Sequence, residues 1–87
     1  MHYFRWTGTK IENLQKRTPG IVVLLTEVDA GGDVTREVGL DGQSNVVHKC
    51  PSTIFRHGVY GLFRLVPLDA SEWRDAITEA EFQKYWA

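Results

Sequence analysis

The sequence predicts an α+β fold, in which one small domain carries an antiparallel β-meander of about four to five strands and a short C-terminal helix. Short β-branched and alternating apolar runs fill residues 21–48, and glycine-containing turn signals separate these runs. A helix-capping pattern follows at residues 78–81. Because the chain has only 87 residues, we expect a single domain over residues 1–87 with one aromatic-rich core.

The first strand is predicted at residues 2–7, where aromatic and polar side chains alternate. Residues 8–19 then become polar and basic, and their only apolar anchors are Ile11 and Leu14, three positions apart. This pattern favours a long loop or one helical turn.

The clearest element is a strand at residues 21–29, which opens with the continuous run Ile-Val-Val-Leu-Leu. Gly31 and Gly32 follow it, and both can supply the positive φ angles of a tight hairpin. Alternation then predicts a strand at residues 34–40 with one mostly apolar face and one mostly solvated face.

Asp41 and Gly42 form a second hairpin signal, since both residue types tolerate the left-handed conformation of a type I′ turn. They predict a connection to a strand at residues 43–48. Proline removes a donor from a strand ladder, so the meander should end at Cys50-Pro51.

The segment after the meander fits neither the helical nor the strand period. Residues 52–61 predict irregular structure and residues 62–68 a short strand or a packed loop. Residues 73–77 are compatible with one further strand.

A capping box predicts the C-terminal helix. The Thr78 hydroxyl should accept a hydrogen bond from the Glu81 amide, and the Glu81 carboxylate should reach back to the amide of Thr78. Phe82, Tyr85 and Trp86 then recur at helical spacing, so we expect these aromatic side chains to dock the helix on the sheet.

Composition predicts a cytoplasmic protein. The formal net charge is −1, from 10 basic and 11 acidic residues, which argues against a nucleic-acid partner or an anionic membrane. A single cysteine cannot form an internal disulfide, and this fits a reducing compartment. The first residues are too polar for a signal peptide, and no apolar run reaches the ~20 residues of a membrane span.

Candidate metal ligands and nucleophiles are few. His48, Cys50 and His57 form the only metal-like group, which is smaller than a structural zinc site of four ligands, so packed or solvated side chains are the favoured interpretation. Ser44, Ser52 and Cys50 occur in no recognisable nucleophile motif. We therefore expect a protein that is not an enzyme and has no cofactor.

Three groups of charged and aromatic residues are candidate binding surfaces. The first is a basic group of Arg5, Lys10, Lys16 and Arg17, near which Tyr3 or Trp6 could stack on a nucleic-acid base. Its alternative is a solvated basic face, which we favour. The second is the group Arg56, His57, Tyr60 and Arg64, whose residue types suit interface hot spots. Its alternative, which we favour, is that Tyr60 and Phe63 close the core under a loop while the arginines face water.

The third group is the acidic series Asp69, Glu72, Asp75, Glu79 and Glu81, which could face a basic partner or could act locally on the helix dipole. From the three groups we select the following candidate partner-binding residues: Arg56, His57, Tyr60, Arg64, Lys16, Arg17, Glu72 and Asp75.

Two stretches carry a family resemblance. Residues 25–38 read Leu-Thr-Glu-Val-Asp-Ala-Gly-Gly-Asp-Val-Thr-Arg-Glu-Val before the turn at Asp41-Gly42, and residues 77–82 read Ile-Thr-Glu-Ala-Glu-Phe. This combination resembles a family of small bacterial domains of unknown function, and the chain is also similar to toxin-immunity-type proteins. The resemblance implies a compact cytosolic protein and carries over no catalytic residue, and residues 52–68 depart from it.

Four functional hypotheses follow. The first is a non-catalytic protein-binding module, most concretely an immunity protein that binds and neutralises a cognate bacterial toxin. The second is a phage-encoded inhibitor of a bacterial defence complex, with the same mode of binding. The third is a small nucleic-acid-binding regulatory domain, and the fourth is a metal-dependent enzyme built on His48, Cys50 and His57.

Overall fold

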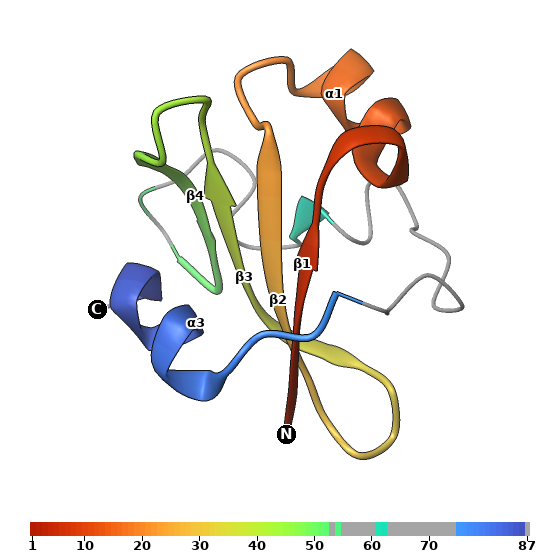
Figure 1. Cartoon of the computed structure of the whole chain (residues 1–87), viewed down its shortest axis with the longest axis vertical. Helices are drawn as coiled ribbons and strands as arrows, with labels where there is room; N and C mark the ends of the chain where they lie inside the picture. Colours follow the sequence, from red (N-terminus) through yellow and green to blue (C-terminus); the bar gives the residue numbers. More distant parts are fainter. Residues whose placement is uncertain (53, 55–60, 63–74, 87) are drawn as a thin grey trace.

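Four strands form one antiparallel sheet in the order β1-β2-β3-β4 (Figure 1). The computed structural model describes residues 1–52, 54, 61–62 and 75–86, without the side chains of residues 9 and 10. The strands are β1 (His2–Trp6), β2 (Val23–Val28), β3 (Val34–Leu40) and β4 (Val46–Cys50). With the C-terminal helix α3 (Glu79–Trp86), they confirm the predicted α+β fold. Each strand pairs with its neighbour in the sequence, as a meander requires.

The connection from β1 to β2 is more helical than the sequence predicted. A 3-10 turn, η1 (Gly8–Ile11), leads into a short helix, α1 (Glu12–Arg17). Ile11 and Leu14 are fully buried, so the two apolar anchors hold this connection against the sheet. The helix ends where the main-chain amide and the hydroxyl of Thr18 both donate to the carbonyl of Leu14, each at 2.8 Å.

The sheet separates two apolar clusters. Helix α3 crosses one face (Figure 1) and contributes Phe82 to a cluster with residues of β1, β2 and β3. The members of that cluster are Tyr3, Leu25, Val38, Leu40 and Phe82. On the opposite face, side chains of β1 and β2 meet those of the first connection and Leu62, which follows β4. The members of this cluster are Trp6, Ile11, Leu14, Ile21, Leu24 and Leu62.

The two edges of the sheet differ. The outer edge of β1 is closed by residues 75–77, since the Arg5 amide donates to the Asp75 carbonyl and the Ile77 amide donates to the Tyr3 carbonyl, both at 2.9 Å. An isolated antiparallel bridge joins Phe4 to Ala76. The further strand predicted at residues 73–77 is thus a short bridge in its described part, and residues 73 and 74 lie outside that part.

On the other edge, no described residue pairs with the outer side of β4. This edge carries a bulge, because Gly39 pairs with His48 whereas Leu40 pairs with Val46. The extra residue, Val47, is 40% exposed. Bulges of this kind twist an edge strand and discourage a further strand from pairing with it.

The two hairpins use the same turn, which differs from the type I′ turn predicted at Asp41-Gly42 and from the pair of positive φ angles expected at Gly31-Gly32. In the first hairpin, the Asp29 carbonyl accepts the Gly32 amide at 3.1 Å, and Asp29 Oδ1 accepts the amides of Gly31 and Asp33 at 2.9 Å. Gly32 has a φ of +88°, whereas Gly31 does not have a positive φ. The turn therefore requires glycine for its positive φ angle at Gly32 and not at Gly31.

The second hairpin repeats this pattern around Asp41. The Asp41 carbonyl accepts the Ser44 amide at 3.1 Å, and Asp41 Oδ1 accepts the amides of Gln43 and Asn45 at 2.9 Å. These amides lower the pKa of Asp41, the Asn45 amide most. The left-handed residue is Ser44, with a φ of 63°, rather than Gly42. The longer loop explains why β4 begins at Val46 instead of at residue 43.

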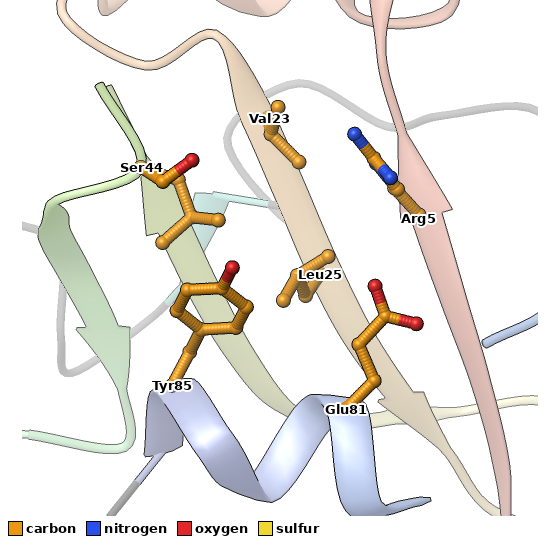
Figure 2. A pocket seen from close by; sticks show the side chains of 7 residues that line it. Arg5, Val23, Leu25, Ser44, Glu81 and Tyr85 are labelled. Carbon is orange, nitrogen blue, oxygen red and sulfur yellow. The ribbon is translucent and has the colours of Figure 1, made fainter. Parts of the chain in front are cut away.

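The start of α3 contains half of the predicted capping box. The Glu81 amide donates to the Thr78 hydroxyl at 3.1 Å, as expected. The structure shows no return bond from the Glu81 carboxylate to the Thr78 amide, although it describes both residues; the carboxylate points over the sheet instead (Figure 2). Phe82 is fully buried, and Tyr85 and Trp86 pack on the same cluster, so the predicted docking of the helix is confirmed.

Within the described ranges, no helix has the length and apolar character needed to cross a membrane.

Candidate functional site

A buried carboxylate beneath α3 organises one face of the sheet. Glu27 of β2 is 5% exposed and accepts four side-chain hydrogen bonds. Tyr3 donates its hydroxyl at 2.9 Å, Thr35 donates its hydroxyl at 2.7 Å, and Arg36 donates Nε and Nη2 at 2.9 and 2.5 Å. The bonds from Arg36 lower the pKa of Glu27 to about 2. The Glu27 carboxylate is therefore ionised and fully engaged at neutral pH.

Arg36 connects this buried pair to the helix. Its guanidinium lies over the rings of Phe82 and Trp86, at 5.0 and 4.8 Å from their centroids. The two rings are themselves stacked, with centroids 6.1 Å apart. Lys49 of β4 donates to the Trp86 carbonyl at 2.6 Å, which places a cation at the C-terminal end of the helix. These contacts fix the position of α3 on β2, β3 and β4.

The opposite face of the sheet holds a second buried pair. His48 Nε2 lies 3.0 Å from Glu37 Oε1, and the Leu62 amide donates to the same oxygen at 2.6 Å. Gly61 packs so closely here that an added β-carbon would lie 3.0 Å from Glu37 Oε2 and 3.2 Å from Cys50 Sγ. The pair thus ties residues 61–62 to β3 and β4, which is a structural role.

Two of the three predicted metal ligands, His48 and Cys50, lie on β4. His48 is buried against Glu37, and Cys50, two residues further along the same face of β4, is partly buried and forms no disulfide. In the part of the chain that the structure describes, no three His, Cys, Asp or Glu side chains are grouped as metal ligands. His57 lies outside the described residues, so the three-residue group stays a prediction.

A shallow pocket, which we call the groove, opens beside α3 on the face of the sheet that carries Glu27 (Figure 2). Its volume is about 50 Å³. The groove is lined by residues from five parts of the chain, namely β1, β2, β3, the second hairpin and α3: Arg5, Val23, Leu25, Leu40, Ser44, Glu81 and Tyr85.

The floor of the groove is apolar. Leu25 and Leu40 are 1% and 4% exposed, and Val23, which also lines the floor, is partly buried. The strand register brings these side chains together, because Val23 pairs with Leu40 across β2 and β3, and Arg5 pairs with Leu25 across β1 and β2. The meander itself therefore builds the floor and sets the arginine at its border.

The border of the groove has a charged side and a hydroxyl side. Figure 2 shows Arg5 and Glu81 on one side and Ser44 and Tyr85 on the other. Among the described residues, neither the Arg5 guanidinium nor the Glu81 carboxylate forms a hydrogen bond or an ion pair. An apolar pocket with an available hydrogen-bond donor and acceptor at its border can bind a peptide main chain. The lining of the groove includes no histidine or cysteine that could take part in nucleophilic catalysis.

The predicted partner-binding residues that the structure describes do not line the groove. Lys16 and Arg17 are exposed in the last turn of α1, away from the groove lining. Asp75 is exposed and holds the edge of β1 through its carbonyl. The remaining candidates lie outside the described residues: Arg56, His57, Tyr60, Arg64 and Glu72. Phe63 and Asp69 of the two wider groups also lie there.

The less favoured alternative, that Tyr3 or Trp6 stacks on a base, is wrong. Tyr3 is buried against Phe82, with ring centroids 5.3 Å apart. Trp6 is 1% exposed and donates its indole N–H to the Thr26 hydroxyl at 3.1 Å. Both side chains are part of the core, so neither can reach an exposed base.

Sequence reasoning missed the groove although it had considered most of its members. Arg5 was assigned to a basic group, Tyr85 to helix docking, and Ser44 was weighed only as a nucleophile. One signal was present in the sequence: Arg5 shares a strand face with Tyr3, so an arginine was to be expected on the face that the helix covers.

Comparisons with protein-family models, with curated proteins and with solved structures find no match to this chain. The resemblance to a bacterial family therefore stays a prediction.

Proposed function

We propose that this chain is a non-catalytic protein-binding domain that recognises its partner through the groove. The observation that carries the proposal is the combination of a buried aliphatic floor, Leu25 and Leu40, with the exposed charges of Arg5 and Glu81 at its border. Interface hot spots are commonly small sockets of this kind, each of which takes one anchoring side chain and is surrounded by polar contacts.

The size of the groove supports a protein partner over a cofactor. Small-molecule sites usually enclose roughly 300–1,000 Å³, whereas the groove has about 50 Å³. Such a volume suits part of one side chain. The remainder of a stable interface, about 800 Å² on each partner, would come from the surrounding surface.

The edges of the sheet offer less to a partner than the groove does. Residues 75–77 already occupy the main-chain groups of β1, and the bulge at Val47 distorts β4. Strand addition needs a regular, open edge. This argues for recognition through the face of the sheet.

An immunity protein that binds and neutralises a cognate bacterial toxin in the cytoplasm is the most concrete form of the proposal. The small α+β fold, the family resemblance and the absence of a nucleophile motif in the sequence support it. A phage-encoded inhibitor of a bacterial defence complex would bind in the same way. The burial of Tyr3 and Trp6 and a net charge of −1 speak against the nucleic-acid alternative.

Co-expression tests the proposal. The chain is expressed with each protein encoded beside its gene, growth rescue is scored, and the affinity of any rescued pair is measured by calorimetry with purified proteins. Two charge swaps in the groove, Arg5→Glu and Glu81→Lys, should weaken binding by about tenfold or more.

Arg17→Glu and Glu12→Lys are matched controls, since both positions are exposed on α1 and make the same charge changes. They should leave the affinity unchanged. A partner whose affinity falls with the α1 variants and not with the groove variants would place the interface on the basic end of α1. Absence of rescue and of binding for every candidate would overturn the proposal.

A further inference from the structure

The groove places a donor and an acceptor next to each other on the same side. Arg5 reaches this side from β1 and Glu81 from α3, while the hydroxyls of Ser44 and Tyr85 lie on the other side (Figure 2). The two charges cancel, so the groove has no net attraction for a lysine or a glutamate. A charged side chain drawn to one of them would be repelled by its neighbour.

An extended main chain matches this arrangement. In an extended strand, the N–H and the C=O of one residue point to the same side, and its side chain points perpendicular to both. A residue whose side chain enters the groove can therefore direct its N–H to the Glu81 carboxylate and its C=O to the Arg5 guanidinium. Both are charge-assisted hydrogen bonds, which are stronger than bonds between neutral groups.

The floor of the groove determines which kind of ligand side chain can enter it. Leu25, Leu40 and Val23 present only aliphatic surface, which favours a branched aliphatic side chain over a polar or charged one. The second hairpin holds Ser44 at the border, because Asp41 accepts the amides on both sides of the turn. The groove is thus formed before a ligand arrives, which lowers the entropic cost of binding.

We infer that the groove binds an extended, uncharged segment of a partner protein, which inserts one leucine-like side chain and bonds through the main chain of that residue to Arg5 and Glu81. This inference rests on the proposed function, since it names the segment that the protein-binding domain recognises.

The test uses defined peptides. Acetyl-Gly-Ser-Leu-Ser-Gly-amide is titrated into the full chain up to about 10 mM, and amide shifts are followed by two-dimensional NMR, with an affinity on the order of 1 mM expected for one anchor. The shifts should be centred on Leu25, Leu40, Ser44 and Tyr85. Peptides with lysine or glutamate in place of leucine should bind more weakly.

N-methylation of the central leucine removes the N–H that Glu81 would accept. We expect it to weaken binding to the wild-type chain by about threefold to tenfold. In Glu81→Gln, the loss on N-methylation should shrink, because the charged acceptor is gone. Because Glu81 is exposed, we expect Glu81→Gln to keep the fold, and Glu12→Gln is the control that should behave like the wild type.

Equal binding of the methylated peptide, equal binding of the lysine or glutamate peptide, or shifts outside the groove would each overturn the inference. So would concentration-dependent dimerisation that Glu81→Lys abolishes, because the occupant would then be a second copy of this chain. If the groove charge swaps abolish partner binding while these peptides fail to bind, only the inference falls. If the peptides bind as expected while no partner protein is found, the proposed function falls instead.

Discussion

Ser44 occupies in the second hairpin the position that Gly32 occupies in the first. Each is the fourth residue of a turn that begins at an aspartate, each donates its amide to the carbonyl of that aspartate, and each is left-handed, with φ angles of 63° and 88°. A residue with a β-carbon costs roughly 1–2 kcal/mol in this conformation, whereas glycine adopts it freely. The chain carries this cost at the border of the groove.

Replacing Ser44 with glycine should therefore stabilise the fold and impair the groove. We expect Ser44→Gly to raise the free energy of unfolding by about 0.5–1 kcal/mol, after allowing for the greater freedom of glycine in the unfolded chain. The same change should weaken binding of the leucine peptide, since it removes a hydroxyl from the groove. Urea denaturation measures the first effect and the NMR titration the second. The reverse exchange, Gly32→Ser, should lower stability and leave peptide binding unchanged; a destabilised Ser44→Gly would contradict the turn assignment.

Gly61→Ala should be strongly destabilising. Gly61 has a φ of +81°, and a β-carbon there would lie within 3.0–3.2 Å of the Glu37 carboxylate and Cys50 Sγ. Strain and crowding together should lower the free energy of unfolding by roughly 2–3 kcal/mol.

Gly32→Ala separates the two contributions to the Gly61→Ala effect. Gly32 has a φ of +88° and nothing within 4 Å of an added β-carbon. This variant should therefore cost only the backbone strain, about 1 kcal/mol. Equal losses in the two alanine variants would show that the contact with Glu37 is loose.

Acid should destabilise the chain through Glu27. Hydrogen bonds from Arg36 lower the pKa of this carboxyl from 4.5 to about 2, so the unfolded chain binds the proton more readily than the folded one. The stabilisation is present above pH 4.5 and is lost as the pH falls towards 2. Its size is roughly 3 kcal/mol at neutral pH. Unfolding measured from pH 7 to pH 2 should show that Glu27→Gln is less stable than the wild type at pH 7 and that the difference narrows in acid. The exposed Glu12→Gln should follow the wild-type curve throughout.

Arg36→Lys should loosen α3 although it keeps the charge. Lysine cannot make the paired bonds to Glu27, and it stacks less well over Phe82 and Trp86. We expect a loss of about 2 kcal/mol and faster hydrogen exchange at the Phe82 amide. Arg17→Lys, at an exposed position, is the control. Unchanged exchange at Phe82 would show that the aromatic contacts alone hold the helix.

The fold was predictable because its signals are local. The β-branched run before Thr26 and the alternation in residues 34–40 identify two strands from neighbouring residues alone. The turns were misread because the side chains of Asp29 and Asp41 bind the turn amides, and because only Gly32 among the turn glycines has a positive φ.

The groove was not predictable in the same way. Arg5, Leu40 and Tyr85 are far apart in the sequence, and only the register of the strands and the docking of α3 bring them together. Trp6 is a residue that the sequence suggested for binding and that the structure removes from the surface. Its aromatic ring could have stacked on a base, but tertiary packing places it in the core.

The closure of β1 by residues 75–77 has a consequence for the order in which the chain folds. Strands β2, β3 and β4 are joined by short hairpins, so their contacts require little loop closure. The bridge from Phe4 to Ala76 instead joins segments from opposite ends of the chain. The loss of chain entropy on closing this long loop is offset by favourable contacts only after the meander has formed. We expect pulse-labelling of amides during refolding to protect Leu25 and Val38 before Arg5 and Ile77. The groove, which needs Arg5 and α3 in place, would then be the last feature to form and the first to open.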